Sequence, residues 1–115
     1  MEFKEVTWNK DFEIEHAKHM GDFLDVIKFE CKTRIAKIWT NGKVTFILGA
    51  DGTELVIMYM QGSDMSSALE AIIEYGKENF NSIRFDSYRK GAERLMKKYG
   101  FKRRFIQMVM EFENG

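Results

Sequence analysis

The chain has 115 residues, of which 44% are hydrophobic and 31% charged, and its formal net charge is zero. This length predicts one domain, residues 1–115, and no apolar run approaches the ~20 residues of a membrane helix, so we expect no membrane association. A single cysteine, Cys31, excludes an internal disulfide. The single cysteine and the charged N-terminus, which is unlike a secretory signal, together favour a cytoplasmic setting.

The first third of the chain predicts a strand followed by helix. Residues 2–8 alternate weakly between polar and apolar side chains, as in a strand. Asn9 and Asp11 can each cap a helical region that runs to about residue 32, and Gly21 divides this region in two. The second piece has an apolar stripe formed by Phe23, Leu24 and Ile27.

The middle of the chain predicts an antiparallel meander of three strands. Three runs rich in β-branched and aromatic residues are joined by Asn41-Gly42 and Asp51-Gly52. Both dipeptides suit type I′ turns, in which both central residues take positive φ. The third run, Leu55–Met60, is almost wholly apolar, so we expect it to lie centrally and to be covered on both faces.

The last third predicts helix, strand, helix and strand. A helix capped by Ser63 or Asp64 leads to a short strand at residues 82–87 and to a second amphipathic helix at residues 88–99. Gly100 stands where a helix end needs a left-handed residue, with Phe101 placed to pack back, as in a Schellman motif.

Residues 104–112 alternate again and predict one final strand. The order β-α(α)-β-β-β-α-β-α-β indicates an α+β (mixed α/β) fold.

This order of elements, with the sequence GAERLMKKYGF, resembles the GNAT superfamily of N-acetyltransferases. The family pattern Asn-x-x-Ala-x-x-Leu-Tyr-x-x-x-Gly-Phe meets Ala92, Leu95, Gly100 and Phe101. The resemblance covers nearly the whole chain in topology and is specific in sequence only at this tail. The size and the tail are also similar to those of short acetyltransferase-like proteins of tailed phages. The resemblance implies a GNAT-like fold with a central, mostly antiparallel sheet and helices on both faces.

The resemblance also implies that acetyl-CoA lies between the strand at residues 55–60 and the next strand, with its pyrophosphate on the amides that open the following helix. The family's Arg/Gln-x-x-Gly-x-Gly/Ala pattern falls on residues 61–66, where Gln61 fits but Asp64 and Ser66 replace the glycines. Repulsion between the Asp64 carboxylate and a phosphate costs about 1 kcal/mol at water-like screening. The implied cofactor contacts are Met58, Met60, Gln61, Gly62, Ser63, Asp64, Ser66, Arg89 and Arg94.

The family often places a tyrosine four residues before the glycine, where its hydroxyl can protonate the departing thiolate. Here that residue is Met96, which has no exchangeable proton. Three residues could substitute. Tyr99 is one turn away but fits a core role better, and Tyr59 faces either the gap or the opposite layer, depending on register. Glu54 could deprotonate an amine, or it is an ordinary glutamate beside a turn.

Two further patterns have competing interpretations. His16 and His19 stand at i, i+3, but they are too few for a metal site, so we expect solvated histidines and no metal. Between Arg84 and Arg104 the chain carries nine basic and two acidic residues, a charge of +7 against −7 elsewhere. This segment could attract a phosphate ligand, pair with the acidic remainder, or grip nucleic acid; burial of its aromatic residues makes the last alternative the weakest.

Two functions therefore stay open. The first is an acetyl-CoA-dependent N-acetyltransferase with a degenerate cofactor loop. The second is a non-catalytic protein of the same fold that binds a partner protein or, less favoured, nucleic acid. The sequence leaves both a monomer and a homodimer possible.

Overall fold

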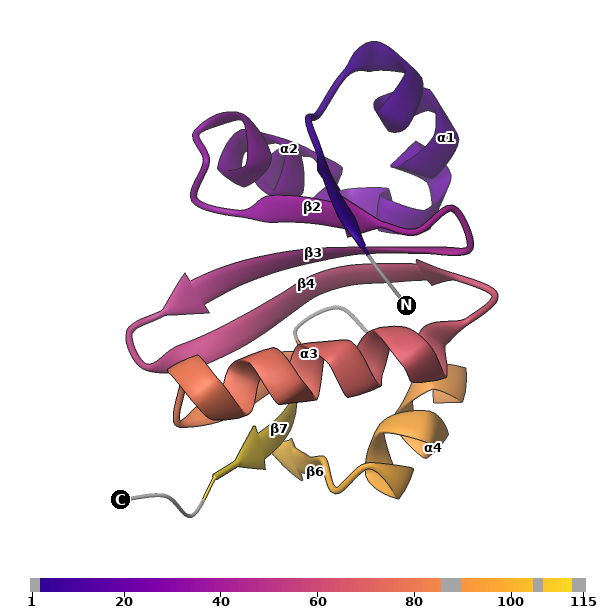
Figure 1. The fold of residues 1–115 in the computed structure, drawn as a ribbon. Helices are drawn as coiled ribbons and strands as arrows, with labels where there is room; N and C mark the ends of the chain where they lie inside the picture. Colours follow the sequence, from indigo (N-terminus) through magenta and orange to yellow (C-terminus); the bar gives the residue numbers. More distant parts are fainter. Residues whose placement is uncertain (1–2, 86–89, 105–106, 113–115) are drawn as a thin grey trace.

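Within residues 3–85, 90–104 and 107–112, which the computed structural model describes, seven strands form one sheet in the order β1-β2-β3-β4-β5-β7-β6 (Figure 1). The strands are β1 (Lys4–Val6), β2 (Lys37–Thr40), β3 (Val44–Asp51), β4 (Glu54–Gly62), β5 (Ser82–Phe85), β6 (Lys102–Arg104) and β7 (Gln107–Glu111). The helices are α1 (Lys10–Met20), the short 3-10 helix η1 (Gly21–Phe23), α2 (Leu24–Lys32), α3 (Met65–Asn79) and α4 (Lys90–Lys98).

The sheet is mostly antiparallel, as predicted. β1 to β4 pair antiparallel in chain order, and so do β5 with β7 and β6 with β7. Only the central pair β4–β5 is parallel among the described strands, because α3 crosses over between them. The apolar strand β4 lies in the middle of the sheet, as its sequence predicted.

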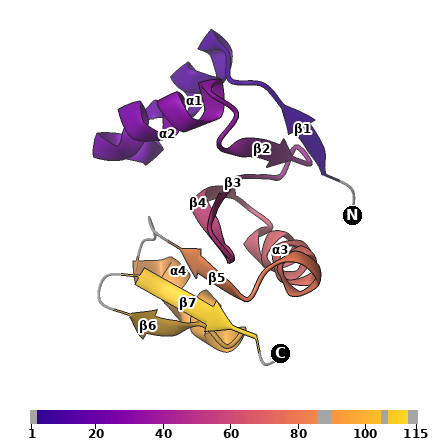
Figure 2. The same cartoon turned by 90° about the vertical axis from the view of Figure 1, so that its left-hand side faces the viewer.

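Helices cover both faces (Figures 1 and 2). α1 and α2 lie over one face, where Ile27 packs in a cluster with Ile38 and Tyr59. α3 and α4 lie over the other, where Leu69 and Met96 pack in a second cluster. The predicted fold class is therefore confirmed, with two cores on either side of one sheet.

The N-terminal helical region follows its sequence signals. The Asn9 side chain accepts a hydrogen bond from the Phe12 amide at 2.8 Å, and Gly21, with φ of 56°, ends α1 and is the first residue of η1. The predicted apolar stripe is wrong at Phe23, which is 54% exposed because η1 rotates it off the buried face. Ile27 is buried as expected.

The meander is confirmed, but neither turn is of type I′. Asn41 has no positive φ; its side-chain oxygen accepts from the amides of Lys43 at 2.9 Å and Val44 at 3.0 Å. This asparagine therefore makes an Asx turn. In the second hairpin Asp51 pairs with Glu54, so Gly52 is the first central residue. Gly52 has φ of 63° and Thr53 has no positive φ, as in a type II′ turn.

The end of α4 is the predicted Schellman motif. Gly100 has φ of 96° and donates to the Lys97 carbonyl at 3.1 Å, while the Phe101 amide donates to the Met96 carbonyl at 3.1 Å. Phe101 is buried against the α3–α4 cluster. The prediction of a single final strand is wrong, because residues 102–104 and 107–111 are two strands that pair antiparallel. The alternation at residues 104–112 continues from the first of these strands into the second, so in the sequence they resemble one strand.

No helix in the described ranges combines the length and apolar character that crossing a membrane requires.

Candidate functional site

The site begins where the described pairing of β4 with β5 ends. Their parallel pairing runs from Glu54↔Ser82 to Ile57↔Phe85, but β4 continues to Gly62. Residues 58–62 of β4 thus have no partner on β5 in the described part of the chain. Backbone N–H and C=O groups along such an edge can pair with another extended molecule.

A β-bulge lies at the same point. Tyr59 pairs with Ile47 and Ile57 pairs with Leu48, so Met58 is an extra residue on β4. A bulge interrupts the alternation of side chains. As a result the adjacent residues Met58 and Tyr59 both pack on the α1–α2 face, whereas Ile57 lies in the α3–α4 cluster.

The loop between β4 and α3 is short and tightly fixed. Gly62 has φ of 145°, and a Cβ there would collide with the Lys43 carbonyl oxygen, so the position requires glycine. The Ser63 amide donates to that same carbonyl at 2.9 Å. Of the predicted cofactor contacts, the Ser63 amide is therefore already engaged within the protein.

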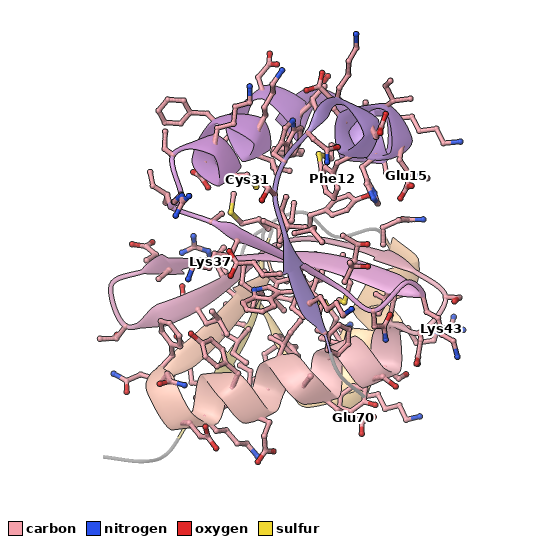
Figure 3. All side chains as sticks on the ribbon, turned by 45° about the horizontal axis from the view of Figure 1, so that its top comes forward. Phe12, Glu15, Cys31, Lys37, Lys43 and Glu70 are labelled. Atoms are coloured by element: carbon pink, nitrogen blue, oxygen red, sulfur yellow. The ribbon has the colours of Figure 1, made fainter. Side chains whose placement is uncertain are left out.

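The start of α3 lies directly beyond. Asp64 holds the N-cap position, but its carboxylate makes no capping hydrogen bond. The amides of the first turn, which includes Ser66, have no carbonyl partner within the helix and carry the positive end of its dipole. Lys43, on the exposed loop between β2 and β3 (Figure 3), stands next to this helix start because Val44 pairs with Gly62. Sequence reasoning missed Lys43, since only the strand pairing brings it here.

Glu54 lies away from this helix start. It opens β4 at the opposite end from Gly62, roughly 26 Å away at the rise of an extended strand. Its carboxylate accepts from the Ser82 hydroxyl at 2.6 Å and from Arg84 at 3.0 Å, and Arg84 also contacts Asp51 at 3.0 Å. Glu54 is thus held in a half-buried polar network.

The α4 candidates point to the neighbouring helix or the core. The Tyr99 hydroxyl donates to Glu70 of α3 at 3.0 Å, so Tyr99 ties the two helices together. Met96 is 0% exposed and lies within the α3–α4 cluster. Arg94 is exposed on α4, and Arg89 falls outside the described residues.

Tyr59 instead joins a chain of titratable groups that sequence reasoning missed. Its hydroxyl lies 2.6 Å from Nδ1 of His16, and both residues are buried. Nε2 of His16 lies 2.9 Å from the carboxylate of Glu15, whose side chain is 73% exposed on α1 (Figure 3). The expectation of a solvated His16 is therefore wrong, because the helix turns it inward against Phe12, at a ring distance of 4.4 Å.

Burial lowers the pKa of His16, so the imidazole is neutral at pH 7. In that state Nδ1 accepts from the Tyr59 hydroxyl and the Nε2 hydrogen is donated to Glu15. The three groups can pass a proton between strand β4 and solvent, with Glu15 stabilising a transient imidazolium. This is the order of groups that activates a hydroxyl in hydrolase triads.

A cavity of about 460 Å³ opens on the same face of β4. Met58, the bulge residue, lines it together with apolar side chains of η1 and α2. Its charged lining residues are Glu30, Asp51 and Arg84. The cavity therefore reaches β4 next to the last described pair of the two strands, Ile57↔Phe85.

The described residues support neither metal binding at the histidines nor nucleophilic chemistry at the cysteine. No group of three or more potential ligands could hold a metal ion among the residues the structure describes. Burial raises the pKa of Cys31 to about 11, so its thiol is protonated at neutral pH and is not a nucleophile.

This fold, with its sheet order and parallel β4–β5 pair, is similar to that of solved GNAT acetyltransferases. The putative acetyltransferase from Exiguobacterium sp. 255-15 superposes with a TM-score of 0.66 at 8% identity, covering 96% of this chain and 92% of that one. Ard1 from Thermoplasma volcanium gives a TM-score of 0.64 at 13% identity, with 99% and 100% covered.

AtaT, in its complex with acetyl-methionyl-tRNAfMet, gives a TM-score of 0.56 at 9% identity, with 96% and 94% covered. No family model matches the sequence, and no curated protein does. The likeness is thus one of fold, and it confirms the resemblance first suggested by the tail sequence.

Proposed function

We propose that the chain is an acetyl-CoA-dependent N-acetyltransferase acting on an amine. The observation that carries this proposal is the stretch of β4 from the Met58 bulge to Gly62, which has no partner on β5 among the described residues and is followed by α3 from Met65. This arrangement offers an extended edge for a thioester arm and a helix start for its phosphates. When bound, acetyl-CoA would supply the activated acetyl group.

The cofactor would contact the β4 edge from Met58 to Gly62, including Met60 and Gln61, and the first turn of α3 at Ser66. Lys43 would add a positive charge beside the phosphates and offset the Asp64 carboxylate. Arg94, and Arg89 from the sequence pattern, are the further cationic contacts. Ser63 would contribute its side chain and not its amide.

The acceptor amine would enter the cavity beside Met58. Of its two described lining carboxylates, Asp51 is paired with Arg84, so Glu30 is the one that favours a cationic group, and the apolar walls favour a carbon chain next to that group. Tyr59 would accept the proton that the amine loses, as it passes its own proton to His16, while the C–S bond of the thioester would break and its electron pair would leave on the thiolate. Glu54 and Tyr99, bound in networks of their own, would act as structural residues.

Calorimetry with acetyl-CoA tests the cofactor site. We expect a micromolar dissociation constant and, at a hundredfold excess over it, about 2.7 kcal/mol of added stability. Asp64→Gly should tighten binding and Lys43→Ala should weaken it, whereas Lys10→Ala, an exposed lysine on α1, should change nothing. An absence of binding at millimolar acetyl-CoA would overturn the proposal.

Release of free thiol in the presence of polyamines and lysine peptides tests the reaction. We expect turnover that falls in Tyr59→Phe while acetyl-CoA binding is kept. Binding without turnover for any amine would instead favour the second candidate, a non-catalytic protein that binds a partner protein or nucleic acid. The buried Met96, which offers no proton to a thiolate, is the observation that supports that alternative.

A further inference from the structure

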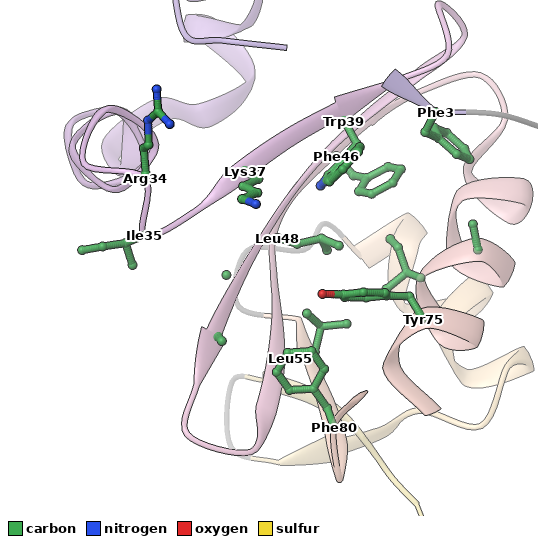
Figure 4. A pocket seen from close by; sticks show the side chains of 14 residues that line it. Phe3, Arg34, Ile35, Lys37, Trp39, Phe46, Leu48, Leu55, Tyr75 and Phe80 are labelled. Carbon is green, nitrogen blue, oxygen red and sulfur yellow. The ribbon is translucent and has the colours of Figure 1, made fainter. Parts of the chain in front are cut away.

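A second cavity, of about 590 Å³, lies on the other face of the sheet (Figure 4). It is formed by β2, β3 and the start of β4 on one side and by the C-terminal half of α3 on the other. This volume is within the range of small-molecule sites. Among the described lining residues, this cavity and the cavity beside α2 share Ile35, Gly49 and Ala50.

Aromatic rings make both walls of this groove. Trp39 and Phe46 are directly opposed on β2 and β3, and the ring of Phe3 lies 4.9 Å from that of Phe46. Across the groove, Tyr75 and Phe80 have ring centroids 6.0 Å apart. Figure 4 shows the Tyr75 hydroxyl pointing from α3 into the groove, toward the strands. Tyr75 is 49% exposed, so this wall of the groove is open to solvent.

One end of the groove is positively charged. Arg34 and Lys37 line it, both are exposed, and neither has a carboxylate within ion-pair distance in the described part of the chain. None of the described residues that line this groove is acidic, in contrast to those of the cavity beside α2. Two unneutralised cations beside a wall of rings complement a ligand with an anionic head and an apolar body.

Arg34 occupies a backbone position that suits glycine. Its φ is 62°, and its amide donates to the Cys31 carbonyl at 3.2 Å, so it is the left-handed residue that ends α2. A side chain with a Cβ is strained there, and glycine or asparagine would fit with less strain. The chain thus carries a guanidinium at the mouth of the groove where the backbone alone favours glycine.

We propose that this groove is a binding site for a small aromatic carboxylate. Its ring system would stack between the Trp39–Phe46 wall and the Tyr75–Phe80 wall, and its carboxylate would be held by Arg34 and Lys37. The Tyr75 hydroxyl would supply a hydrogen bond to a polar substituent. The site does not depend on acetyl transfer, because it lies along the opposite half of α3 from the helix start.

Titration of the whole chain with 2-naphthoate tests the site. The indole N–H resonance of Trp39 should shift on binding, while that of Trp8, in the other cluster, serves as an internal reference. The uncharged analogue 2-naphthamide should bind at least about tenfold more weakly, the equivalent of 1.4 kcal/mol. Equal binding of the two, or equal shifts of both indole resonances, would overturn the proposal.

Substitutions of the two cationic residues distinguish a loss of ligand binding from a loss of fold stability. Arg34→Gly should preserve or raise the melting temperature and yet weaken 2-naphthoate about tenfold, because it removes strain and the guanidinium together. Lys37→Gln should weaken it similarly, and Lys10→Gln should have no effect. If Arg34→Gly proved to destabilise the fold, Arg34→Asn, which also tolerates positive φ, would give the same comparison.

A second copy of the chain, or a protein partner, is the competing occupant. Sedimentation of the free chain and of its 2-naphthoate complex distinguishes them. A monomer that binds 2-naphthoate supports the proposal. A dimer that excludes 2-naphthoate from Trp39 overturns it.

Discussion

His16 is a buried titratable residue whose protonation opposes folding. Burial lowers its pKa below the ordinary value, while Glu15 acts to raise it and His19 to lower it. Because the unfolded chain binds a proton more readily than the folded one, stability is highest above the unfolded pKa and falls as the pH drops below about 6.5. The loss continues until the folded pKa is passed.

The prediction is that the free energy of unfolding falls between pH 7 and pH 5, by up to 1.4 kcal/mol per pH unit from this residue. His16→Asn keeps an acceptor for Tyr59 but does not titrate, so its unfolding free energy should depend less on pH. Urea unfolding at a series of pH values measures this. His19→Asn is the matched control, and an equal flattening in both variants would contradict the assignment to His16.

Gly62 is required by the close approach of β4 to the β2–β3 loop. An alanine there combines positive φ with a collision against the Lys43 carbonyl, whereas nothing lies within 4 Å of a Cβ at Gly42, whose φ is 89°. We expect Gly42→Ala to cost about 1 kcal/mol and Gly62→Ala about 3 kcal/mol or more. Thermal unfolding compares the two. Similar costs would mean that conformation alone, and not the contact, explains the glycine.

At the scale of single elements, the packing of α4 explains why position 96 does not suit a catalytic tyrosine. Its side chain is fully buried between α3 and the sheet, and the Schellman ending at Gly100 fixes the rotation of the helix. A tyrosine there would have to place a hydroxyl in an apolar cluster.

Met96→Tyr should therefore destabilise the fold by about 1–3 kcal/mol and should not raise the rate of acetyl transfer. Met96→Leu, which conserves volume, should cost under about 1.5 kcal/mol. Chemical denaturation together with the thiol-release assay tests this. A faster Met96→Tyr enzyme would show that α4 can rotate its side chain into the gap.

The sequence could predict the elements whose ends are fixed by residues close together in the chain. Asn9 caps α1 within its own turn, and the glycine and aromatic residue that end α4 lie beside the bonds they make. The turn types failed because they depend on strand register: pairing of Asp51 with Glu54 moves the turn onto Gly52 and Thr53.

At the scale of the whole molecule, the candidate site depends on pairs far apart in sequence. His16 and Tyr59 are 43 positions apart, and Glu54 and Ser82 are 28 apart. No periodicity in either segment signals such a contact. The Met58 bulge decides that Tyr59 faces α1, and bulges depend on the pairing of two strands, so the sequence left that orientation open.

The two proposed ligand sites lie on different parts of α3, one at its first turn and one along its middle and C-terminal half, at Ile72 and Tyr75. If both assignments hold, neither ligand contacts the other's site, and the coupling free energy between them should be near zero. The dissociation constant of acetyl-CoA should then be the same with and without saturating 2-naphthoate, within about twofold. Calorimetry in the two conditions measures this. Competition would mean that the two ligands share one site, and a tighter constant would mean that α3 transmits binding along its length.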